Sequence, residues 1–131
     1  MKKTLLAIGL IFVSWFVIDF LVHGVALVSL YDSTAQLWRA QEDMNVILIH
    51  SVTLFTVFGF VLIYSELIAN KSMGKAIQYS FIFGAVSGVS MGFGSFAYMP
   101  IPFSLALSWF GVVLFECMLG GVILGLIYKN K

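Results

Sequence analysis

Charge, cysteine and proline are all scarce in this chain. Of its 131 residues only 10% are charged, against about a quarter in an average soluble domain. The single cysteine, Cys117, excludes an intrachain disulfide and any zinc or iron–sulfur site built from cysteines. The net charge of +1 comes without a basic run, so the sequence indicates no nucleic-acid partner.

Hydrophobic residues make up 61% of the chain, and its mean hydropathy is +1.05. A soluble protein this short could not bury so much apolar surface, whereas a lipid bilayer tolerates it. The length suits one compact domain covering residues 1–131. We therefore predict a single-domain integral membrane protein whose first partner is the lipid bilayer.

Four apolar stretches are each close to or longer than the ~20 residues that cross the hydrocarbon as a helix. They cover approximately residues 4–30, 45–68, 76–98 and 103–128. Helices satisfy their own backbone hydrogen bonds in lipid, and no stretch alternates apolar and polar residues as a barrel strand does. The prediction is an all-α bundle of four transmembrane helices.

The basic residues are distributed unevenly between the two sides of this bundle. Lys2, Lys3, Lys71, Lys75, Lys129 and Lys131 flank one side. The positive-inside rule places that side, with both termini, in the cytoplasm. The bias argues against insertion in both orientations, and it suits the inner membrane of a bacterium.

The first external loop, residues 31–44, is expected to hold a short amphipathic segment. Ser33 followed by Gln36 has the pattern of a capping box that opens a helix. Trp38 and Arg39 are residue types that anchor at a membrane interface. A simple connector is favoured over a binding loop, because amphipathic interfacial helices are common.

Small residues recur at a spacing of four in the last two spans. The set is Gly84, Gly88 and Gly92 in the third span, and Cys117, Gly121 and Gly125 in the fourth. Such spacing lets helix backbones approach closely in lipid, so we interpret these residues as helix-packing positions. A permeation path lined by small residues is the alternative.

Four ionisable side chains inside the spans are the candidates for chemistry, because such groups are costly in hydrocarbon. At 1.5 Å per residue, His50 lies roughly 8 Å from the external end of its span, His23 roughly 10 Å, Asp19 roughly 16 Å and Glu116 roughly 20 Å. Asp19 and His23 share one helix face. If the faces meet, the four residues form a polar column open to the outside.

Three functional hypotheses compete for this column. Asp19, His23, His50 and Glu116 could bind a divalent transition metal, since imidazole and carboxylate suit several such ions. His23 and His50 could hold a haem between the first two spans. Asp19 and Glu116 could take up protons in a coupled transporter, with the histidines as a relay.

The structural alternative is that these residues pair with one another and set the helix register, for example Asp19 with His23 and His50 with Glu116. No nucleotide-binding, serine-hydrolase or zinc-protease motif is present in the sequence, and little chain lies outside the membrane for a catalytic domain. We therefore expect a non-enzymatic protein, an accessory or oligomerising subunit in a homo-oligomer or a larger membrane complex. A carrier or binding site for a metal ion or protons is the second interpretation, and a haem-binding subunit the third.

Overall fold

The computed structural model describes residues 1–129, and within that range it contains helices and no strand. The α-helices are α1 (Lys2–Leu21), α2 (Val28–Ser33), α3 (Val46–Leu62), α4 (Met73–Val89), α5 (Ser95–Tyr98) and α6 (Phe103–Tyr128). Three π-helical turns extend them, at Val22–Ala26, Ile63–Leu67 and Ser90–Gly94.

Four continuous helical segments are long and apolar enough to cross a membrane, as the sequence predicted. They run over Lys2–Ala26, Val46–Leu67, Met73–Tyr98 and Phe103–Tyr128. The third begins earlier than the expected residue 76, because the Ser72 side chain caps the helix by accepting a hydrogen bond from the Lys75 backbone N–H (3.2 Å). Asn45 caps α3 in the same way through the Leu48 N–H (2.9 Å).

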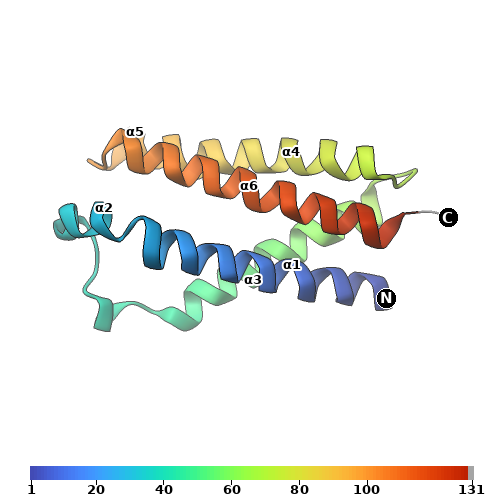
Figure 1. Cartoon of the computed structure of the whole chain (residues 1–131), viewed down its shortest axis with the longest axis horizontal. Coiled ribbons are helices and arrows are strands. Elements are labelled where there is room, and N and C mark those ends of the chain that lie inside the picture. The colour runs from blue at the N-terminus through green and yellow to red at the C-terminus, as the bar shows by residue number, and fades with distance from the viewer. Residues whose placement is uncertain (130–131) are drawn as a thin grey trace.

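The start of α1 and the end of α6 lie at the same end of the bundle, which we call the terminal end (Figure 1). Residues 34–45 and the turn at 99–102 lie at the opposite end, which we call the loop end (Figure 1). The turn contains Pro100 and Pro102, neither of which offers a backbone N–H, so the chain reverses there between α5 and α6.

Helices α4 and α6 lie side by side along most of their length (Figure 1). Their backbones are so close that a Cβ atom added to Gly84 would lie 2.8 Å from Cys117 Cβ, and one added to Gly88 would lie 2.9 Å from the Phe110 carbonyl oxygen. Gly92 faces the backbone of Ala106 in the same way. Further along α6, Gly121 lies against Ser80 and Gly125 lies against Met73.

Two hydrophobic clusters stabilise the bundle. The terminal-end cluster joins α1, α3, α4 and α6 around Ile11, Phe60, Tyr64 and Leu124. The loop-end cluster consists of the buried residues Leu27, Ile101, Leu105, Ala106 and Trp109, with Trp38 packed against them.

Helix α3 crosses the bundle obliquely and is buried only in its second half (Figure 1). There the Tyr79 hydroxyl donates a hydrogen bond to the Phe60 carbonyl oxygen (2.8 Å), which ties α3 to α4. The first half of α3 is exposed, with Ile47 82% and Leu48 58% accessible. The bundle is therefore closed at the terminal end and looser around the start of α3.

The predicted capping box at Ser33 and Gln36 is wrong. Ser33 is the last residue of α2, and its hydroxyl donates to the Leu30 carbonyl oxygen (2.8 Å) instead of capping a new helix. Two 3-10 turns, Ala35–Leu37 and Gln41–Asp43, replace the single short helix. Of the two expected interfacial anchors, Arg39 is exposed, whereas Trp38 packs on Tyr31 and Trp109, with ring centroids 5.6 and 6.0 Å apart.

Candidate functional site

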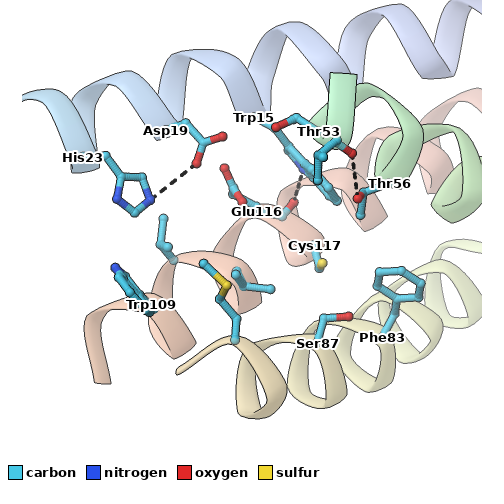
Figure 2. A pocket seen from close by; sticks show the side chains of 14 residues that line it. Trp15, Asp19, His23, Thr53, Thr56, Phe83, Ser87, Trp109, Glu116 and Cys117 are labelled. Atoms are coloured by element: carbon cyan, nitrogen blue, oxygen red, sulfur yellow. Dashed lines mark hydrogen bonds and ion pairs between the residues drawn. The ribbon is translucent and has the colours of Figure 1, made fainter. Parts of the chain in front are cut away.

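A cavity of about 270 Å³ lies between the two hydrophobic clusters. Trp15 of the terminal-end cluster and Trp109 of the loop-end cluster are both part of its wall. Figure 2 shows Asp19, His23 and Glu116 on one side of the cavity, with Ser87 and Phe83 of α4 across from them. Among the described residues, no lysine or arginine lines this space.

Glu116 is the most deeply buried acidic residue of the cavity, with 6% of its surface exposed. Its carboxyl group points toward that of Asp19 (Figure 2), and each group lies within the electrostatic influence of the other. The Glu116 Oε1 atom is buried and has no hydrogen-bond partner among the described residues. A buried carboxyl oxygen without a partner is costly, so this atom marks a site where a donor or a cation would be stabilised.

The helix around Glu116 is itself held firmly. The indole Nε1–H of Trp15 donates a hydrogen bond to the Glu116 carbonyl oxygen (2.8 Å), which joins α1 to α6 at the level of the cavity. Because Trp15 is only 4% exposed, this bond is shielded from solvent. The two helices that carry Asp19 and Glu116 are thereby fixed relative to each other.

Asp19 and His23 form the pair expected from their spacing on α1. The distance between His23 Nε2 and Asp19 Oδ1 is 3.6 Å, which is an ion-pair distance rather than a strong hydrogen bond. His23 belongs to the π-helical turn Val22–Ala26, in which the Leu27 N–H bonds to the Val22 carbonyl oxygen (2.8 Å). Turns of this kind occur frequently at functional sites.

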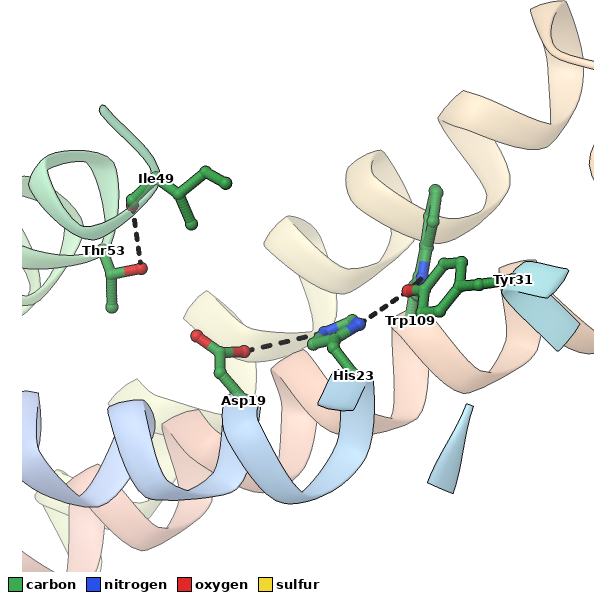
Figure 3. Close-up of polar contacts among 6 residues, drawn as sticks. All are labelled: Asp19, His23, Tyr31, Ile49, Thr53 and Trp109. Carbon is green, nitrogen blue, oxygen red and sulfur yellow. Dashed lines mark hydrogen bonds and ion pairs between the residues drawn. The ribbon is translucent and has the colours of Figure 1, made fainter. Parts of the chain in front are cut away.

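A hydrogen-bonded chain continues from His23 toward the loop end (Figure 3). Trp109 Nε1 can only donate, so the Tyr31 hydroxyl oxygen accepts its bond (2.8 Å). The Tyr31 hydroxyl also shares a hydrogen bond of 2.6 Å with His23 Nδ1, in which either group can be the donor. Where the hydroxyl donates this bond, the proton of neutral His23 lies on Nε2, facing Asp19. The Tyr31 hydroxyl and the Trp109 indole thus orient the ring that contacts the carboxyl pair.

Of the four ionisable candidates, His50 is the one that the fold leaves out of the cavity. Its side chain is exposed, and its ring packs against Phe16 with the centroids 5.0 Å apart. It is near enough to interact electrostatically with Asp19, but it forms no part of the cavity wall. The suggested pairing of His50 with Glu116 is therefore wrong, since Glu116 faces Asp19.

The positions of Asp19, His23, His50 and Glu116 can be compared with those that a metal ion or a haem would need. Among residues 1–129, no group of three or more His, Cys, Asp or Glu side chains is placed to hold a metal ion. Both ring nitrogens of His23 already face protein groups, Tyr31 and Asp19. His50 packs on Phe16, away from the cavity, so the two histidines do not flank one shared space. We assign no metal ligand or haem ligand to these residues.

Sequence reasoning had not placed Tyr31 or Trp109 in the site. A tyrosine after a transmembrane span and a tryptophan inside one are ordinary packing residues, so the sequence alone carries no signal for their contact across 78 positions. The π-helical turn at Val22–Ala26 was missed as well. The only nearby residue that could have indicated a change in helix geometry is Gly24, one residue after His23.

The fold and the hydropathy of its helices define the class of a multi-pass, all-helical membrane protein. Comparison of the chain with protein-family models, curated proteins and solved structures gave no match.

Proposed function

We propose that this chain is a non-enzymatic membrane protein that takes up and releases a proton at Asp19 and Glu116. The observation that carries this proposal is the buried Glu116 Oε1 atom, which lacks a hydrogen-bond partner among the described residues while its carboxyl group faces Asp19. A proton placed between the two carboxyl groups supplies the missing donor.

Electrostatics support a single shared proton. Two negative charges side by side in a low-dielectric cavity repel strongly, so two close carboxyl groups hold one proton between them. No lysine or arginine of the described part of the chain lines the cavity to compensate a second negative charge. His23 is the one basic group in the wall, and its Nε2 atom faces Asp19.

The chain of Tyr31, His23 and Asp19 offers a route for the proton from the loop end to Glu116. The Tyr31 hydroxyl and the His23 ring are 2.6 Å apart, and the His23 ring and the Asp19 carboxyl group are 3.6 Å apart. Imidazole accepts a proton on one nitrogen and releases it from the other, which suits a relay. The uneven distribution of lysines supports a cytoplasmic terminal end, so the relay would start on the external side.

We further propose that the protein works as an accessory or oligomerising subunit, in the cytoplasmic membrane of a bacterium. Beyond Glu116, Phe60, Tyr64 and Leu124 are fully buried and fill the bundle toward the terminal end. The Glu116 Oε1 atom itself has no hydrogen-bond partner among the described residues, so no hydrogen bond leads onward from it. Transfer across the membrane would require a partner chain, and the exposed first half of α3 is available to one.

Infrared spectroscopy of the detergent-purified protein tests the proton site. We expect the carbonyl stretch of a protonated, buried carboxylic acid at neutral pH, and its loss in Glu116→Gln and in Asp19→Asn. Glu66→Gln is the matched control, because Glu66 is exposed and does not line the cavity, and it should keep the band. A spectrum without a band that depends on Glu116 would show that both carboxyl groups are ionised, contrary to the proposal.

A further inference from the structure

The cavity has space for more than a proton. Its volume of about 270 Å³ lies just below the range of small-molecule pockets. Most of the wall is apolar or aromatic, with Trp15, Trp109 and Phe83 among its members. Thr53 and Thr56 belong to the wall too, but their hydroxyls donate to the carbonyl oxygens of Ile49 and Val52.

The buried polar atom of this wall that lacks a partner is therefore acidic. Glu116 is more than nine-tenths buried, and its unpartnered Oε1 atom belongs to a carboxyl group in the cavity wall. The titratable groups on this side are Asp19 of α1 and His23 of the π-helical turn that follows it, and His50 of α3 lies near Asp19. Helix α4 contributes no titratable side chain to the wall, and α6 adds only the Cys117 thiol.

The cavity reaches the surface between α3 and α4. Val52 on α3 is 58% exposed, Met91 in the π-helical turn that follows α4 is 47% exposed, and both belong to the wall. These are membrane-spanning helices, so this opening faces the lipid rather than water. A ligand that enters here must dissolve in the bilayer, and it must carry a positive charge to complement the carboxyl pair.

We propose that this cavity binds a small, lipid-soluble organic cation, with an aromatic or aliphatic body and a single ammonium group, in exchange for the proton shared by Asp19 and Glu116. The inference rests on the proposed proton site. The exchange balances charge: one cation enters, and the proton leaves the carboxyl pair for bulk water. The net charge in the low-dielectric cavity is unchanged, so the exchange avoids isolating a second negative charge. Aromatic rings in the wall add the attraction between a cation and a π face.

The probe is benzyltrimethylammonium, whose quaternary nitrogen has no proton of its own. Binding to the full chain in mild detergent is measured by titration calorimetry, in two buffers of different ionisation enthalpy. We expect one proton to be released for each cation bound, and a tenfold gain in affinity for each unit rise in pH while the pair holds its proton. The uncharged analogue of the same shape, neopentylbenzene, should not displace the probe.

Three variants distinguish the cavity from the rest of the protein. Glu116→Gln should lower affinity at least tenfold. Ser87→Phe places a ring in the cavity and leaves both carboxyl groups intact, so it should abolish binding and keep the infrared band of the shared proton. Glu66→Gln should bind the probe as the natural protein does.

The two proposals fail in different ways. An infrared band without cation binding would overturn the inference and leave the proton site standing. Binding that is independent of pH, or equal in Glu116→Gln, would overturn the exchange. Absence of the band would overturn the proton site, and with it the exchange. Displacement of the probe by neopentylbenzene would show that the cavity selects for shape rather than charge, which also contradicts the inference.

Discussion

At the scale of single residues, Tyr31 connects parts of the chain that are far apart in sequence. Its hydroxyl accepts a hydrogen bond from Trp109 and is directed at His23. Burial raises the pKa of the Tyr31 phenol, so this hydroxyl keeps its proton at and above neutral pH. Tyr31 therefore orients the His23 ring that contacts the carboxyl pair, and it is also the first member of the proposed proton relay.

Replacement of Tyr31 by phenylalanine should destabilise the protein. The change leaves the Trp109 N–H and His23 Nδ1 without partners in a half-buried place, which lowers the free energy of unfolding by about 1–3 kcal/mol. Equilibrium unfolding in mixed detergent micelles measures the difference. Tyr98→Phe is the control, because Tyr98 is 77% exposed and should be unaffected. Equal stability of the two variants would contradict the hydrogen-bonded chain.

At the scale of elements, the contact between α4 and α6 depends on residues without side chains. At Gly88 a Cβ would lie 2.9 Å from the Phe110 carbonyl oxygen, a backbone atom that cannot move without moving α6. Gly111, also helical, has nothing within 4 Å of the corresponding position. Two glycines in similar helices are thus expected to tolerate alanine very differently.

Gly88→Ala should lower the free energy of unfolding by about 1–3 kcal/mol, because the added methyl group forces the two helices apart. Gly111→Ala should leave stability unchanged or raise it by up to about 1 kcal/mol, since alanine is the better helix former. Unfolding of both variants in the same micelles gives the comparison. A tolerant Gly88 would mean that α4 and α6 separate easily and do not form a rigid pair.

At the scale of the whole molecule, the helices border a mostly apolar cavity with a carboxyl pair on one side. The loop end contains the chain from Tyr31 to Glu116, while the terminal end is filled by the apolar residues around Phe60 and Leu124. Among the described residues, the hydrogen-bonded chain that starts at Tyr31 ends at the carboxyl pair, where Glu116 Oε1 has no partner. The single chain is therefore expected to work together with others.

Purification from native membranes in a mild detergent should yield particles heavier than one chain with its detergent. Native mass spectrometry would identify either multiple copies of the chain or a stoichiometric partner protein. Substitutions on the exposed face of α3, such as Phe55→Asn, should dissociate these particles, whereas the same change at Leu126, 64% exposed on α6, should not. A monomer at native expression levels, without any partner, would contradict the subunit proposal.

The sequence by itself determined that the protein lies in a lipid bilayer, that it has four membrane-spanning segments, and how deep each ionisable residue lies along its span. Hydropathy and helix length are local properties, and depth follows from counting residues along a helix axis. The prediction of four spans could be made for this reason. Their ends shifted by a few residues, for example at the third span, which Ser72 caps.

Only the tertiary structure decided which of these residues meet. Depth along a helix says nothing about its rotation around its own axis, which is set by packing, here largely by the glycines of α4 against α6. That rotation turns Glu116 toward Asp19, while the oblique path of α3 leaves His50 against Phe16. Tyr31 and Trp109 meet for the same reason, since a contact across 78 positions depends on how the helices pack and not on local sequence.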